Sequence, residues 1–132
     1  MSTYHRVYPG IWDEPWDDDA RYVAFYLLTC RHRRLEGVYR LPWAYVLADL
    51  DWSEDRLVAA WERLERHGFI EYDRAAGVVW IVKAMVRQPP ENPNQRKSVI
   101  RAVNDLPDCT VVNRFRTVAA TVHEQFAEGF SE

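Results

Sequence analysis

Residues 53–85 contain one amphipathic helix, a glycine that ends it, and two short strands joined by a turn. Ser53 is a preferred N-cap residue, and Gly68 is the residue type that most often follows the last turn of a helix. The apolar residues that share one face of this helix are Leu57, Ala60, Trp61 and Leu64. Because that face is apolar, the helix must pack on a core.

The residues after Gly68 predict a β-hairpin. Residues 69–72 and 78–82 have the composition of strands, and residues 73–77 have that of a turn. The second strand is almost continuously apolar, so we expect it to be buried on both faces or covered by another element. A helix followed by such a hairpin is the second half of a winged helix. Winged helices mostly bind double-stranded DNA or further copies of themselves.

The preceding residues predict the first half of the same fold. We expect a short strand at 4–8, irregular backbone at 11–16, a helix at 18–30 capped by acidic residues, a strand at 38–41 and a helix at 43–50. The resulting order is helix, strand, helix, helix, strand, strand. This is the order of a winged helix, in which the short strand pairs with the hairpin.

The composition changes after Met85. A connector rich in proline and asparagine precedes a helix at 94–105, and Leu106-Pro107 separates it from a last helix at 111–127. The predicted fold class is therefore α+β, mainly α: a winged helix-turn-helix with extra C-terminal helices. We expect a winged-helix domain at 1–86, a connector at 87–93, and a helical extension at 94–132 that packs on the same domain.

Composition limits the range of functions. A chain of 132 residues with a net charge of −3 and a pI of about 5.8 is not a strong non-specific nucleic-acid binder, so DNA binding needs a local patch. Two cysteines are too few for a disulfide framework and fit no metal spacing. The sequence contains no membrane-length apolar run and no signal-peptide core, so we expect a cytoplasmic protein.

No pattern in the sequence predicts an enzyme. Five acids between Asp13 and Asp19 could suggest a divalent-metal site, but three of them are better explained as helix-capping residues. The four histidines have no metal-binding spacing, and the five glycines form no phosphate-binding loop. We therefore expect no catalytic, cofactor or metal site.

Two groups of basic residues are candidates for contact with DNA. The first follows one flank of the helix at 54–67 and reaches the wing: Arg56, Arg63, Arg66, His67 and Arg74. The second lies in the stretch from Met85 to Arg116, which carries a local charge of +3: Arg96, Lys97 and Arg101. In the alternative interpretation, both groups are solvated helix faces with pairs such as Glu62–Arg66. Four acids on the other flank of the first helix would repel a DNA backbone.

Short motifs across nearly the whole chain occur in a characteristic order and spacing. They are Trp12-Asp13, Leu27-Leu28-Thr29, Gly37-Val38-Tyr39, Gly68-Phe69-Ile70, Val79-Trp80-Ile81 and Pro90-Glu91-Asn92-Pro93-Asn94, followed by Ser98-Val99 and Leu106-Pro107. In these motifs the chain resembles the N-terminal winged-helix domain of phage replication proteins, the replisome organisers, and more distantly DnaD-type primosomal proteins. The resemblance implies binding to origin or single-stranded DNA, homo-oligomer formation, and recruitment of helicase or its loader.

Such proteins usually continue into a second, C-terminal domain, and in DnaD-type proteins the winged helix is chiefly an assembly module. Three hypotheses follow: a DNA-binding domain of a phage or prophage replication system, an interaction module without strong DNA affinity, and a winged-helix transcriptional regulator. The interaction module would use Tyr4, Tyr8, Trp12 or Trp16 as hot spots. The regulator would dimerise through the last helix and bind half-sites about one DNA turn apart. That helix could equally pack on its own domain.

Overall fold

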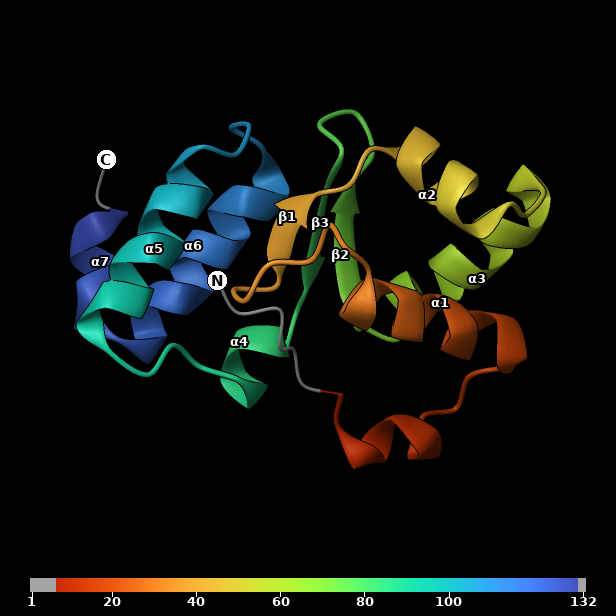
Figure 1. Ribbon diagram of the computed structural model, residues 1–132, viewed down its shortest axis with the longest axis horizontal. Helices are drawn as coiled ribbons and strands as arrows, with labels where there is room; N and C mark the ends of the chain where they lie inside the picture. The colour runs from red at the N-terminus through yellow and green to blue at the C-terminus, as the bar shows by residue number, and fades with distance from the viewer. Residues whose placement is uncertain (1–6, 131–132) are drawn as a thin grey trace.

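The computed structural model describes residues 7–130, and in this range seven α-helices accompany one three-stranded antiparallel sheet (Figure 1). The class is α+β, mainly α, as predicted. The strand predicted at 4–8 falls mainly outside the described residues. No helix within these residues is both long and apolar enough to cross a membrane.

The elements up to residue 81 follow the predicted order helix, strand, helix, helix, strand, strand, which confirms that order. Their bounds are α1 Asp18–Thr29, β1 Val38–Arg40, α2 Trp43–Leu50, α3 Glu54–Arg66, β2 Ile70–Asp73 and β3 Val78–Ile81. The prediction of irregular backbone at 11–16 was partly wrong, because a 3-10 helix, η1, covers Pro9–Asp13. Proline favours the first turn of a helix, and the buried Ile11 holds this one on the core.

The helix starts follow the predicted caps. The Asp17 carboxylate accepts a hydrogen bond from the Ala20 backbone N–H at 2.9 Å, and the Ser53 hydroxyl accepts one from the Arg56 N–H at 3.3 Å. These bonds satisfy backbone donors that have no partner inside the helix. They fix where α1 and α3 begin, and thereby which residues of each helix face the other.

Strand β3 lies at the centre of the sheet, in the order β1-β3-β2. Val79 and Ile81 face a core shared with α1, α2 and α3, whereas Val78 and Trp80 face a second core. All four residues are at most 3% exposed. The expectation that this strand is buried on both faces is confirmed. Figure 1 accordingly shows the sheet between α1–α3 on one side and α5–α7 on the other.

The C-terminal part contains four helices, where the sequence predicted two. They are α4 Ala84–Arg87, α5 Pro93–Asn104, α6 Thr110–Val122 and α7 Glu124–Gly129. The single helix predicted at 111–127 was wrong: it breaks at His123, whose backbone is extended and whose ring nitrogen accepts the Gln125 N–H at 3.0 Å.

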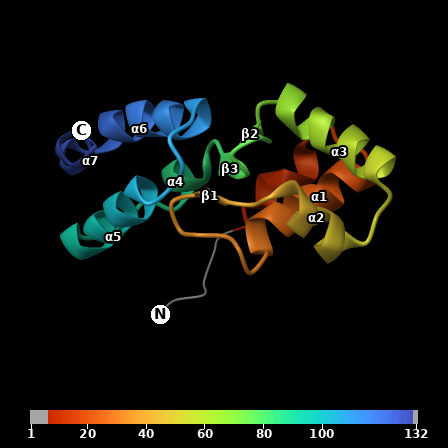
Figure 2. The ribbon, with the colours of Figure 1, turned by 90° about the horizontal axis from the view of Figure 1, so that it is seen from above.

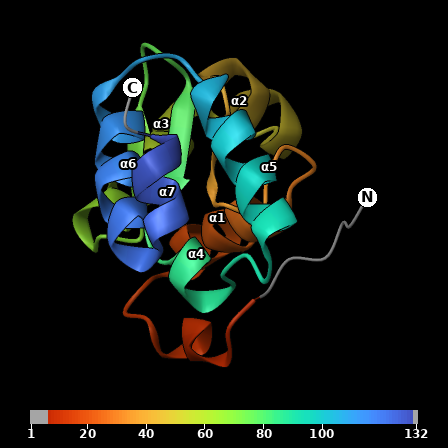
Figure 3. The ribbon, with the colours of Figure 1, turned by 90° about the vertical axis from the view of Figure 1, so that its left-hand side faces the viewer.

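The break lets α7 fold back between α5 and α6, as Figure 3 shows. Phe126 becomes fully buried, and its ring stacks on that of Phe130 at 5.8 Å. Phe115 completes the cluster. The apolar face proposed for dimerisation is thus largely covered by the chain itself, although Val118 and Val122 remain about 40% exposed.

Candidate nucleic-acid interface

Two of the predicted DNA-binding arginines on α3 are held by acids at the start of α1. The Arg56 guanidinium donates two hydrogen bonds of 2.9 Å to the Asp19 carboxylate and lies 3.7 Å from the centre of the Trp52 ring. Arg63 forms an ion pair with Asp17 at 3.0 Å. The hydrogen bond from Arg56 lowers the pKa of the Asp19 carboxyl below its usual value. The charge of each arginine is therefore paired with a carboxylate of the same chain.

The outward surface of α3 is mainly acidic. Asp55, Glu62 and Glu65 are exposed there. Arg56 and Arg66 are exposed as well, and of the three arginines of α3 only Arg66 forms no ion pair within residues 7–130. The suggested Glu62–Arg66 ion pair is not formed in the described part of the chain. Glu65 is nevertheless partly shielded from water, and this partial desolvation, together with the nearby Glu62 charge, raises the pKa of its carboxyl. A DNA groove would therefore meet more negative than positive charge on this helix.

The turn between β2 and β3 is tied to α3. Arg74 at its tip donates a hydrogen bond of 2.7 Å to Glu54, and its guanidinium lies 4.3 Å from the centre of the Trp43 ring. The Trp43 indole N–H donates to the same Glu54 oxygen at 3.0 Å. Arg74 still keeps 56% of its side chain exposed. The turn thus presents a cation whose charge is already partly compensated.

The second predicted group lies on α5. Arg96 is half-buried and donates to the Gln125 side chain at 2.7 Å, whereas Lys97 and Arg101 are exposed. Within the described residues, neither of these two forms an ion pair. Figures 1 and 2 both show α5 at the opposite end of the molecule from α3. The eight predicted residues therefore form two separate surfaces.

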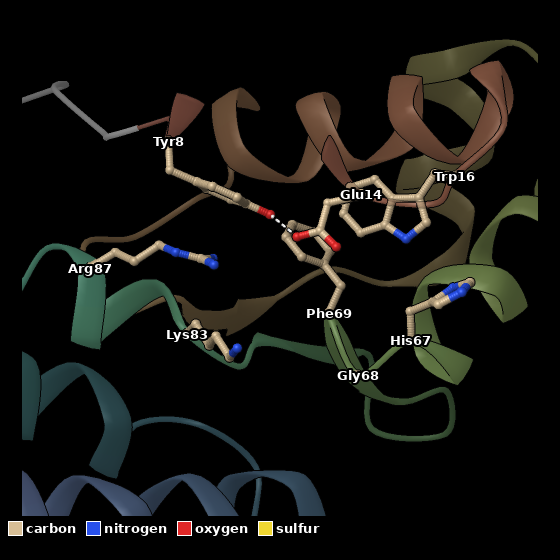
Figure 4. Close-up of a pocket in the computed structure, with 8 residues that line it drawn as sticks. All are labelled: Tyr8, Glu14, Trp16, His67, Gly68, Phe69, Lys83 and Arg87. Atoms are coloured by element: carbon tan, nitrogen blue, oxygen red, sulfur yellow. Dashed lines mark hydrogen bonds between the residues drawn. The ribbon is translucent and has the colours of Figure 1, made fainter. Parts of the chain in front are cut away.

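A third basic site was missed by the sequence analysis. His67 at the end of α3 meets Lys83 and Arg87 around a cavity of about 70 Å³, which Figure 4 shows in close-up. Its other wall comes from the N-terminal segment, where the Tyr8 hydroxyl donates to Glu14 at 3.0 Å. The contributing segments are far apart in sequence. The local signal was the four-residue spacing of Lys83 and Arg87 after a strand.

Large aromatic side chains lie exposed over η1, α1 and α2. Trp12, Tyr22 and Tyr45 are 67%, 58% and 51% exposed. Each rests on a more buried ring: the centroid distances are 5.5 Å for Trp12–Phe25, 5.5 Å for Tyr22–Trp52 and 5.3 Å for Tyr45–His32. We call Trp12, Tyr22 and Tyr45 the aromatic surface. Such residues are enriched at protein interfaces.

Trp16, predicted as an interaction hot spot, is only 6% exposed, so that prediction was wrong. Its ring packs against Phe69 in an edge-on contact with centroids 5.0 Å apart. Of the other predicted hot spots, Tyr8 is half-buried, Trp12 belongs to the aromatic surface, and Tyr4 lies outside the described residues. No group of three or more potential metal ligands occurs in residues 7–130.

The chain was compared with protein-family models, with curated proteins and with solved structures, and none of the three comparisons found a match.

Proposed function

We propose that residues 1–86 form a winged-helix domain and that the chain is a DNA-binding protein of a phage or prophage replication-initiation system. The main support for this proposal is the order of the elements along the chain: α1, β1, α2, α3, β2 and β3, with the sheet order β1-β3-β2. In helix-turn-helix proteins the helix at the position of α3 enters the major groove. The proposed replication role rests on the resemblance to replisome organisers. A protein with that role would work in the cytoplasm.

The proposed mode of binding is contact with the sugar-phosphate backbone. Arg56 and Arg63 are ion-paired, and the outward surface of α3 is acidic, so α3 has few side chains for reading base edges. Arg66, His67 and Arg74 remain exposed at the end of α3 and on the wing. Contacts of this kind give affinity that depends strongly on salt and little on sequence.

Charge reversal maps the surface that contacts DNA. Arg66→Glu alters the α3 surface, and the double variant Lys97→Glu with Arg101→Glu alters α5. Arg31→Glu is the control for Arg66→Glu, because it changes the net charge equally outside the proposed contacts. We expect Arg66→Glu to weaken binding of a labelled duplex about tenfold, which corresponds to about 1.4 kcal/mol of binding free energy. We expect a smaller loss of affinity for Arg31→Glu. Equal losses for Arg66→Glu and Arg31→Glu would contradict a contact at α3.

A protein-interaction module is the second candidate, and the aromatic surface favours it. Trp and Tyr dominate the binding energy of many interfaces, and three large rings are more than half exposed here. In a replication system the partner would be helicase, its loader, or another copy of this chain. Light scattering tests the last case, since a mass well above 15.6 kDa that returns to this value in Trp12→Ala with Tyr22→Ala would support it.

A further inference from the structure

The cavity at the end of α3 gathers three basic side chains from different segments. His67 follows α3, Lys83 precedes α4, and Arg87 ends α4. The proposed contact with DNA uses only His67 among them. Arg66, the exposed arginine of α3 that forms no ion pair within the described residues, directly precedes His67 in the chain.

The cavity carries an excess of positive charge. Glu14 is its one acidic residue among the described residues that line it, against the two cations Lys83 and Arg87. The Glu14 carboxylate already accepts the Tyr8 hydroxyl, and the Arg87 guanidinium lies 3.6 Å from the centre of the Tyr8 ring. Lys83 is exposed and forms no ion pair within residues 7–130. A negatively charged group would therefore be attracted to the cavity.

A buried hydrogen-bond donor also lines this cavity. Trp16 is only 6% exposed, and its indole N–H has no hydrogen-bond acceptor among the described residues. Figure 4 shows the ring nitrogen on the edge of Trp16 nearest His67. Buried donors are almost always paired with an acceptor, from the protein, from water or from a ligand. An oxygen placed in the cavity would supply one.

We propose that this cavity binds one phosphate group of the DNA backbone. A cavity of about 70 Å³ has room for a group as small as one phosphate. The exposed Lys83 ammonium can contact the phosphate directly, and the Arg87 guanidinium adds positive charge to the cavity. The proposal rests on the proposed function, because DNA is the source of the phosphate.

Inorganic phosphate tests the cavity without DNA. The indole N–H signals of 15N-labelled protein are recorded by NMR during a phosphate titration, and Trp16→Phe assigns the signal of Trp16. We expect that signal to move downfield and to saturate, and Lys83→Gln to weaken the apparent affinity at least fivefold. Arg31→Gln, which removes one exposed charge outside the cavity and outside both candidate groups, serves as the matched control. An unmoved Trp16 signal, or the same affinity in Lys83→Gln as in the wild type, would overturn the proposal.

A DNA titration then connects the cavity with the proposed function. Loss of one phosphate contact lowers the slope of log affinity against log salt by about 0.9 for duplex DNA. We expect this change for Lys83→Gln and a smaller one for a matched variant, Arg31→Gln. Duplex binding with an unchanged slope in Lys83→Gln overturns the cavity proposal and leaves the proposed function intact. Absence of DNA binding by the wild type overturns both.

Discussion

At the scale of single residues, three glycines of the described chain have left-handed backbone, and two of them, Gly68 and Gly37, adopt it for different reasons. Gly68 ends α3 with φ of +74°, and a β-carbon there would meet no atom within 4 Å. Gly37 has φ of +81°, and a β-carbon there would collide with the β-carbon of Ala84. The sequence could predict the glycine after α3 from its position, but the close approach at Gly37 depends on where α4 packs.

This difference predicts unequal costs of substitution. Gly68→Ala should lower the free energy of unfolding by about 1–2 kcal/mol, because alanine is strained in left-handed backbone. Gly37→Ala should lower it by about 1–3 kcal/mol more, because the added methyl group also overpacks the contact with Ala84. Urea denaturation of both variants measures the two losses of unfolding free energy. Equal losses of unfolding free energy, or a larger loss for Gly68→Ala, would show that α4 can shift away from Gly37 at little cost.

Glu36 predicts a pH effect on stability. The residue is 1% exposed, and burial raises the pKa of its carboxyl above the usual 4.5, despite the Arg34 partner at 2.8 Å. The unfolded chain therefore ionises Glu36 first, so the stabilising contribution is complete below pH 4.5 and is lost as pH rises through the folded-state pKa. The Glu36→Gln variant does not show this loss of stability, because glutamine does not ionise.

The stability of Glu36→Gln relative to the wild type should consequently increase between pH 4 and pH 7, roughly 1.4 kcal/mol for each unit by which the pKa is raised. Denaturation curves of the two proteins across this range measure the difference, in which the other titrating groups cancel. A difference that does not vary with pH would exclude a raised pKa at Glu36.

At the scale of elements, the contact between α1 and α3 controls how much positive charge α3 presents. Asp17 and Asp19 hold Arg63 and Arg56. Asparagine also caps helices well, so Asp17→Asn with Asp19→Asn should leave α1 intact and release both arginines. We expect duplex affinity at low salt to rise about fivefold for each released arginine, or ~1 kcal/mol apiece.

Asp13→Asn with Asp18→Asn is the matched control for that variant. It removes two nearby carboxylates, and neither forms an ion pair with an arginine in the described structure. Anisotropy titrations of both double variants separate the release of arginines from the change in net charge. The same gain in affinity for both would mean that the α1–α3 ion pairs do not restrict DNA binding.

Local signals predicted most of the elements, because caps and apolar periodicity act over a few residues. Ser53, Asp17 and Gly68 fixed the ends of α1 and α3. The break at His123 was not predictable in this way, since 111–127 has a continuous helical pattern. The break is stabilised by packing of Phe126 and Phe130 against distant residues, which no local pattern encodes.

At the scale of the whole molecule, β3 joins two cores. Val78 and Trp80 pack with residues of α5, α6 and α7, so removal of everything after Arg87 would expose them to water. We expect the truncated chain to aggregate or to lose cooperative unfolding, whereas the full chain unfolds in one transition followed by tryptophan fluorescence and circular dichroism. A truncated monomer within about 1 kcal/mol of the full chain would instead show an independent domain.

The candidate site shows the limit of sequence reasoning at this scale. Charge and spacing located the cations of α3 and α5, but not the acids of α1 that neutralise Arg56 and Arg63. Nor could they show that α3 and α5 lie at opposite ends of the molecule (Figure 1). Both facts depend on tertiary packing between segments far apart in the chain.

DNA affinity of the purified wild-type chain tests the central claim most directly. Fluorescence anisotropy of labelled double- and single-stranded DNA is measured at about 50 and about 150 mM salt, with light scattering on the same sample. If about three phosphates are contacted, duplex affinity should fall about twentyfold between these two salt concentrations. No binding at either concentration, together with a mass well above 15.6 kDa, would contradict the DNA-binding account and favour the interaction module.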